Sequence, residues 1–284
     1  MSDEDAALAG KYHAALAGLV EKLEALAGLE YVADDYVAFR IAVARAQADV
    51  LEKLRGRDPP SIDIELVAEY FDAIRSASNA CGGESAELRK IAKAAAQDRS
   101  LLEDAAARGI IGAEDGLIAR LAEKIGIPEP ALAFVAHLLA SPFAVAMVPN
   151  GKAASAGRCP RCGSGPALAK LRRGDGKRVL YCSLCGADWE HPRLVCPDCG
   201  NDDPAALKVL FVSRESPRFA ESCAKCELYI KTIDERRLPE GETVLPFVEE
   251  TATLYLDLLA EKEGLRRNQP LAAAFPARHV SGGE

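Results

Sequence analysis

The sequence predicts an α+β protein in which an N-terminal all-α helical domain is followed by two tandem rubredoxin-like or zinc-ribbon modules and a C-terminal helix. Three observations lead to this architecture. Apolar residues recur at helical spacing through the first half of the chain. Short β-prone runs separate four Cys-x-x-Cys pairs in the second half. Helical spacing then returns near the C-terminus, in "PFVEETATLYLDLLAEKEG".

The composition is that of a soluble globular protein. The chain has 284 residues, of which 49% are hydrophobic, and its formal net charge is -8. Its pI is near 5.3 and its mean hydropathy is -0.03. Proteins that bind nucleic acid along a basic surface usually carry excess positive charge to neutralise phosphates. The acidic balance therefore argues against that class.

The chain begins with "MSDEDAALAG", which has neither the basic segment nor the apolar run of a secretory signal. No uncharged apolar run reaches the roughly 20 residues of a membrane-spanning helix. The richest apolar stretch, from Ala131 to Val148, contains Pro142 and is expected to be a buried helix. None of the Arg-Arg pairs is N-terminal, as an export signal would require. We therefore expect a cytoplasmic protein without membrane insertion.

Residues 1–148 are expected to form a helical domain with short connections. The double proline at 59–60 separates the first two helices, and Gly109 ends the third because glycine readily takes the left-handed conformation of a helix cap. The predicted helices cover 36–54, 61–76, 85–108, 113–125, and a last stretch from Pro128 or Pro130 to the residue before Pro142.

The second half begins after a linker of small residues, "VPNGKAASAG". "RRGDGKR" predicts a hairpin, because Asp-Gly tolerates the positive dihedral angles of a tight turn. Strands are expected at 168–171, 178–181, 208–213 and 229–233, and a helix at 246–263 with Gly264 as its cap. The predicted boundaries are 149–157 for the linker, 158–194 for the first ribbon, 195–237 for the second ribbon, 238–270 for the C-terminal helical segment and 271–284 for a disordered tail.

Eight of the nine cysteines lie in Cys-x-x-Cys pairs, which we call clips because two intervening residues let both sulfurs turn to one side. A glycine follows the second cysteine in three clips, whereas Glu227 follows it in the fourth. We predict that all eight ligate metal: Cys159, Cys162, Cys182, Cys185, Cys196, Cys199, Cys223 and Cys226. The ninth, Cys81, is expected to be an ordinary thiol.

The simplest assignment joins each clip to its neighbour. The first two clips are separated by 19 residues, which matches the spacing of zinc ribbons closely, and the last two by 23, which is slightly long. This gives two metal ions, each bound by four cysteines, although an interleaved pairing remains open. Four sulfurs in a tetrahedron suit zinc and also a rubredoxin-like iron, so the sequence does not identify the metal.

Thiol redox chemistry is the main alternative to metal binding. A redox Cys-x-x-Cys is activated at a helix N-terminus within a βαβ unit, whereas these pairs lie among short strands and turns. We find no nucleophile–base motif, phosphate loop or dinucleotide-binding glycine pattern, and so expect no enzymatic activity. His13, His137 and His279 are scattered and have no expected site role. Trp189 is expected to pack between the ribbons or to contact a partner.

The chain resembles the formate dehydrogenase accessory protein family, the FdhE type, over roughly residues 18 to 270. The most specific segments are "RCPRCGSGP", "LYCSLCGADWEHPRLVCPDCGN" and "FAESCAKCELYIKTID", and "YVAFRIAVARAQ" and "TLYLDLLAEKEGLRRNQP" are similar to the family's flanking helices. Glu249-Glu250 stands where the family often has an aspartate pair, and "NQP" where it often has Asn-Pro.

The resemblance implies a cytoplasmic accessory factor that is needed for active formate dehydrogenase and has no dehydrogenase activity itself. It also implies binding to that enzyme's catalytic subunit before export or assembly, with iron associated with the clips. Trp189 and Tyr229 are the predicted partner contacts. Two alternatives remain at this point: a rubredoxin-like electron carrier or thiol-redox protein serving the same client, and a zinc-ribbon protein that binds nucleic acid.

Overall fold

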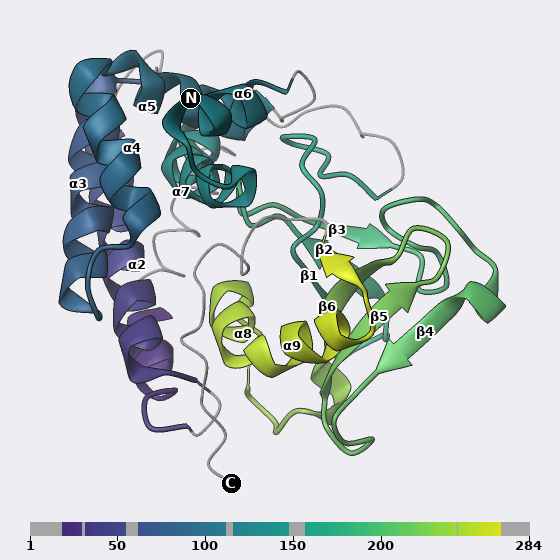
Figure 1. Ribbon diagram of the computed structural model, residues 1–284. Coiled ribbons are helices and arrows are strands. Elements are labelled where there is room, and N and C mark those ends of the chain that lie inside the picture. Colours follow the sequence, from purple (N-terminus) through teal and green to yellow (C-terminus); the bar gives the residue numbers. More distant parts are fainter. Residues whose placement is uncertain are drawn as a thin grey trace, which may run out of the picture.

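The computed structural model describes residues 19–29, 32–54, 62–111, 116–147, 157–242 and 244–267. Helices from the first half of the chain stand on one side of the molecule and a mixed β-sheet on the other, with helices α8 and α9 between them (Figure 1). Of the predicted features, His13, His279, the double proline at 59–60, the tail at 271–284 and all of the linker except Gly157 lie outside the described residues.

The helical half contains helices at the predicted positions, but their ends are shifted and one predicted helix is divided in two. Asp63 caps one helix by accepting hydrogen bonds from the Glu65 and Leu66 N–H groups, and Ser85 caps the next through the Leu88 N–H. The helices are α2 (Asp34–Leu54), α3 (Ile64–Ala80), α4 (Ala86–Gln97), α5 (Ser100–Ile111), α6 (Leu117–Ile125) and α7 (Glu129–Met147).

The single helix predicted over 85–108 is wrong, because the chain breaks after Gln97 into α4 and α5. The Asp98 carboxylate accepts hydrogen bonds from the Ser100 N–H at 3.2 Å and the Ser100 hydroxyl at 2.6 Å. Such a local side-chain bond offers the backbone an alternative to continuing the helix. The helix also passes the expected stop at Gly109 and ends at Ile111.

The predicted end of the last helix before Pro142 is also wrong, since α7 continues to Met147 with Pro142 inside it. Proline removes one hydrogen bond and crowds the preceding turn. Burial outweighs this cost, because Leu139, Phe143 and Ala144 are each 0% exposed. By length and composition, residues 129–146 could cross a membrane, but 78% of this window is buried inside the protein. This helix therefore belongs to the protein core.

The core of the helical half is formed by the facing sides of helices α2 to α7. Tyr70, Ile74, Ile91, Leu132 and Leu139 are among its fully buried side chains. A second apolar cluster joins this half to the C-terminal helices, with Val37 and Val145 on one side and Val248 on the other.

The described part of the second half forms one seven-stranded sheet, in the order β3-β2-β1-β6-β5-β4, with β7 beside β6. Strands β1 and β6 pair in parallel and join the two clip-bearing regions, while the other pairs on the main path are antiparallel. The strands are β1 (Leu168–Leu171), β2 (Arg178–Tyr181), β3 (Asp188–His191), β4 (Leu207–Leu210), β5 (Arg218–Cys223), β6 (Leu228–Asp234) and β7 (Arg266–Arg267).

The sequence prediction of the first hairpin is confirmed, because β1 and β2 have the predicted bounds. The predicted strand at 208–213 is three residues too long at its end and begins one residue too late, and the strand predicted at 229–233 extends by one residue at each end. Strands β3, β5 and β7 were not predicted.

The single C-terminal helix predicted over 246–263 is divided at Thr253 into α8 (Pro246–Ala252) and α9 (Leu254–Lys262). Both the N–H group and the hydroxyl of Thr253 donate to the Glu249 carbonyl. Bonding of a threonine hydroxyl to the preceding turn often bends helices. Gly264 follows α9 with φ +74°, as the predicted cap requires.

Candidate metal centres

The structure brings the four clips together as two groups of four sulfurs. The Sγ atoms within each group all lie within 4.8 Å of one another. Neighbouring clips meet, and the interleaved arrangement is not formed. We call Cys159, Cys162, Cys182 and Cys185 the first site, and Cys196, Cys199, Cys223 and Cys226 the second site.

All four clips have the same turn, in which the residue after the second cysteine donates its N–H to the carbonyl of the first cysteine. The distances are 2.9 Å for Gly163 to Cys159, 3.1 Å for Gly186 to Cys182, 3.0 Å for Gly200 to Cys196 and 2.8 Å for Glu227 to Cys223. Each donor residue has a positive φ, from 59° to 76°.

This turn explains the glycine that follows three of the clips. Glycine takes a positive φ without steric cost, whereas an L-residue with a side chain does so at a cost of about 1–2 kcal/mol. Glu227 is the only non-glycine residue with a positive φ in the described part of the chain. The fourth clip therefore keeps the common turn at the expense of backbone strain.

The sulfur positions fit a tetrahedral ion. In the first site Cys159 lies 3.5 Å from Cys185 and Cys162 lies 3.4 Å from Cys182. In the second site the corresponding distances, Cys196 to Cys226 and Cys199 to Cys223, are both 3.7 Å. A metal–sulfur bond of about 2.3 Å gives a tetrahedron with sulfurs about 3.8 Å apart. Each group can therefore hold one ion, with zinc and iron equally suited.

The close packing of the sulfurs also couples the ionisation of the thiols. Hydrogen bonds from Cys159, and then from Cys182 and Cys185, lower the pKa of Cys162 well below its usual range. Hydrogen bonds with Cys159 and Cys162 raise the pKa of Cys182. One thiolate in the group thus makes it harder to ionise the next, because like charges repel at this distance. Four thiolates would need a bound cation.

The first site is enclosed by the helical half. Cys159 and Cys185 are each 0% exposed and pack with Ala140 and Ala144 of α7. The Arg161 guanidinium donates to the Val145 carbonyl at 3.0 Å and to the Cys185 carbonyl at 3.3 Å.

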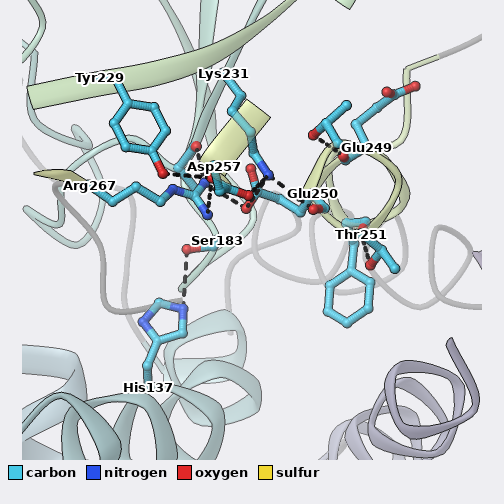
Figure 2. Close-up of polar contacts among 12 residues, drawn as sticks. His137, Ser183, Tyr229, Lys231, Glu249, Glu250, Thr251, Asp257 and Arg267 are labelled. Atoms are coloured by element: carbon cyan, nitrogen blue, oxygen red, sulfur yellow. Dashed lines mark hydrogen bonds and ion pairs between the residues drawn. The ribbon is translucent and has the colours of Figure 1, made fainter. Parts of the chain in front are cut away.

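His137 of α7 reaches the second clip of this site. Its Nε2 atom lies 3.1 Å from the Ser183 hydroxyl (Figure 2). Burial lowers the pKa of His137 to about 4, so the ring is neutral at physiological pH. No site role was predicted for His137, because its contact with Ser183 depends on the packing of α7 against the clip.

The second site lies nearer to solvent. Cys199 is exposed and Cys226 is half-buried, whereas Cys196 and Cys223 are buried. The carbonyl of Val195, which precedes this site, accepts from Arg178 Nη1 at 3.2 Å and lies 3.3 Å from His191 Nε2. Both side chains come from the strands of the first ribbon.

Trp189 on β3 is half-buried and packs against Ala169, Leu180 and Ile230. It also touches the cluster around the first site. This position matches the expected packing between the ribbons. A partner contact through the remaining exposed part of the ring stays a prediction.

Tyr229, the other predicted partner contact, is 6% exposed. Its hydroxyl donates to the Asp257 carboxylate at 2.7 Å, and burial raises its pKa. Such a position does not fit the surface role expected for Tyr229. The side chain instead belongs to a buried polar network between β6 and the C-terminal helices (Figure 2).

That network balances two cations against two anions. Lys231, which is 0% exposed, donates to the Asp257 carboxylate at 2.8 Å and to the Glu250 carbonyl at 3.0 Å. Arg267 donates to the Glu250 carboxylate at 2.6 Å and to the Ala167 carbonyl at 3.0 Å. The network fixes α8, α9 and β7 to the sheet. The sequence analysis did not single out Lys231, Asp257 or Arg267.

The comparisons with known proteins concern mainly the half of the chain that carries the clips. Residues 158–193 match the family model described as the central domain of FdhE. Residues 195–272 match the model described as the C-terminal domain of FdhE. The resemblance stated from the sequence motifs is therefore confirmed over these residues.

Two curated relatives illustrate the likeness. The chain is 37% identical over 109 residues to the FdhE homolog of Aquifex aeolicus, covering 37% of this chain and 38% of that protein. It is 32% identical over 124 residues to the FdhE homolog of Haemophilus influenzae strain Rd, covering 43% and 40%. The matches thus span about two fifths of these relatives' length. The crystal structure of the FdhE protein from Pseudomonas aeruginosa is similar with a TM-score of 0.49 and 19% identity, covering 94% of this chain and 97% of that one.

Proposed function

Because residues 158–193 and 195–272 match the models of the central and C-terminal domains of FdhE, we propose that the protein is an accessory factor of formate dehydrogenase. It would bind the enzyme's catalytic subunit in the cytoplasm, before export or assembly, and would not itself catalyse a reaction. The observation that carries this proposal is the pair of four-cysteine groups within the residues that match the family.

All eight paired cysteines would serve as metal ligands. A metal ion bound by four thiolates supplies a fixed joint between two clips, and its binding free energy stabilises a small module that has little core of its own. The sheet and the helical half would then present a rigid surface to a large client protein. Trp189, at the junction of the ribbons, would be part of that surface.

The second candidate function is electron transfer to the same client. It is favoured by the exposure of Cys199, because a rubredoxin-like iron at the second site would lie near solvent. Reversible bleaching of a visible iron–thiolate absorption, accompanied by reduction of the client, would support this function over the first.

The test is an anaerobic pull-down of the host formate dehydrogenase catalytic subunit with the tagged protein, together with metal analysis of the eluate. We expect the catalytic subunit to be retained and about two ions per chain. The Cys182→Ser/Cys185→Ser variant should lose both client and metal. Cys81→Ser, which removes a cysteine outside both sites, is the matched control and should retain them. A metal-loaded protein that retains no catalytic subunit would refute the accessory role.

A further inference from the structure

The two metal sites differ in what supports them. The first site is closed by α7, through the packing of Ala140 and Ala144 and through hydrogen bonds that involve Arg161 and His137. Helix α7 belongs to the large core of the helical half, which is built without any contribution from the metal. The first site therefore has a preformed wall.

The second site is supported instead by contacts with the first ribbon. Gly157 lies two residues before Cys159, and Pro197 lies inside the clip that begins at Cys196. A Cβ atom added to Gly157 would lie 1.7 Å from the Pro197 carbonyl oxygen and 2.6 Å from its carbon. Contacts this short with backbone atoms are not tolerated. The backbone entering the first site thus touches the backbone of the second site directly.

The same clip has two more supports from the first ribbon. Arg178 on β2 and His191 on β3 both reach the carbonyl of Val195, immediately before Cys196. Arg178 is 3% exposed and also pairs with Glu221 of β5 at 3.0 Å. The order of β2 and β3 depends in turn on the turn at Cys182–Cys185 that connects them, which the first site closes.

The second site is also more accessible to solvent than the first. All first-site cysteines except the half-buried Cys162 are buried, whereas Cys199 of the second site is exposed. A chelator or competing thiol attacks a metal site through its accessible ligands. The second site is open to such attack and the first is covered by α7.

We propose that the two sites are not equivalent: the first is a structural site that fills first and retains its ion, and the second is an exchangeable site whose assembly depends on the first. The dependence runs through Gly157, Arg178 and His191 to the clip that begins at Cys196. The first site does not depend on the second to the same degree, because α7 supports the first site even when the second is empty.

The experiment uses the full chain loaded with zinc under anaerobic conditions, and the metal per chain is measured after removal of free zinc. The Cys223→Ser/Cys226→Ser variant should keep one ion. The Cys182→Ser/Cys185→Ser variant should keep almost none, although its second set of ligands is intact. One retained ion in each of the two variants would overturn the proposal. No client protein takes part, so the result is independent of the accessory role.

A second measurement applies if the first-site variant does not fold. Zinc release from the unsubstituted chain to a chromophoric chelator should occur in two phases of equal amplitude. Gly157→Ala, with all eight ligands intact, should accelerate the fast phase at least about tenfold and leave the slow phase unchanged. Gly83→Ala is the matched control, because Gly83 also has a positive φ but has no atom within 4 Å of an added Cβ. Release in one phase, or equal behaviour of the two glycine variants, would refute the proposal.

Discussion

Replacing Glu227 by glycine should stabilise the second metal site. Glu227 has φ 59° in the turn after the fourth clip, where the other three clips have glycine. Its backbone N–H bonds to the Cys223 carbonyl and its carbonyl accepts from the Arg266 N–H at 2.9 Å, and both bonds survive the substitution. The side chain is exposed, so little packing is lost.

The magnitude follows from two opposing terms. A left-handed conformation costs an L-residue about 1–2 kcal/mol relative to glycine. Glycine loses more conformational entropy on folding, which returns about 0.5–1 kcal/mol of that gain. The net stabilisation is therefore about 0.5–1 kcal/mol, which corresponds to about a two- to five-fold tighter binding of zinc when folding and binding are coupled.

The assay is competition for zinc against a chelator of known affinity, with urea unfolding of the zinc-loaded protein as a second readout. Gly200→Ala is the matched reverse change, since Gly200 occupies the same turn position in the third clip with φ +70° and an added Cβ would meet no atom within 4 Å. It should weaken binding by a similar factor. Unchanged or weaker binding in Glu227→Gly would show that the backbone strain argument is wrong.

Three further predictions concern the rest of the fold. Lys231→Met should lower the free energy of unfolding by about 3–5 kcal/mol, because it leaves the two buried carboxylates of Glu250 and Asp257 with Arg267 as the one remaining cation of the network; a thermal midpoint equal to that of the unsubstituted protein would contradict this. Hydrogen bonds from Arg236 lower the pKa of Asp234 below its ordinary value of 3.8, so this pair stabilises the fold above that pH and the stabilisation is lost as the pH falls. Asp234→Asn should therefore flatten the acid limb of a curve of unfolding free energy against pH. An unaltered acid limb would exclude the pair as its cause. Removing metal with a chelator should abolish near-ultraviolet circular dichroism from Trp189 but retain most of the helical signal, because the core of α2 to α7 contains no ligand; parallel loss of both signals would show that the two halves unfold together.

The parts of the site that the sequence predicts are those set by local geometry. A clip and the residue after it form one turn, so four similar clips imply four similar turns and the substitution at Glu227 marks the strained one. The hairpin of β1 and β2 is predicted for the same reason, because Asp175-Gly176 fixes its turn.

Helix boundaries were predicted less well because two of them depend on single side chains acting on the backbone. Asp98 and Thr253 each interrupt a periodic apolar pattern by a short-range hydrogen bond, and neither residue excludes a helix on its own. Pro142 was predicted to end its helix, but α7 continues through it to Met147. The cost of the proline is local, whereas the burial that outweighs it comes from the packing of the whole helical half.

The joining of the two ribbons into one sheet depends on a parallel pairing between strands more than fifty residues apart, which no local pattern indicates. In this pairing Leu168 lies opposite Lys231 and Leu171 opposite Asp234. Parallel strands are usually covered on both faces. Strand β6 is central to the sheet and six of its seven residues are buried, including Lys231, Thr232 and Asp234.

The segment "YIKTID" does not alternate regularly between apolar and polar residues, since Lys231 lies on one face of the strand and Thr232 and Asp234 on the other. Here both faces are covered, so each polar side chain needs a partner inside the protein. Lys231 meets Asp257 on the face toward α9, and on the opposite face the Thr232 hydroxyl donates to Glu221 at 2.7 Å, while Glu221 also pairs with Arg178. The polar residues of β6 therefore fix the C-terminal helices on one side and the support of the second metal site on the other. A substitution on either face of β6 should therefore disturb both the packing of the C-terminal helices and the support of the second metal site.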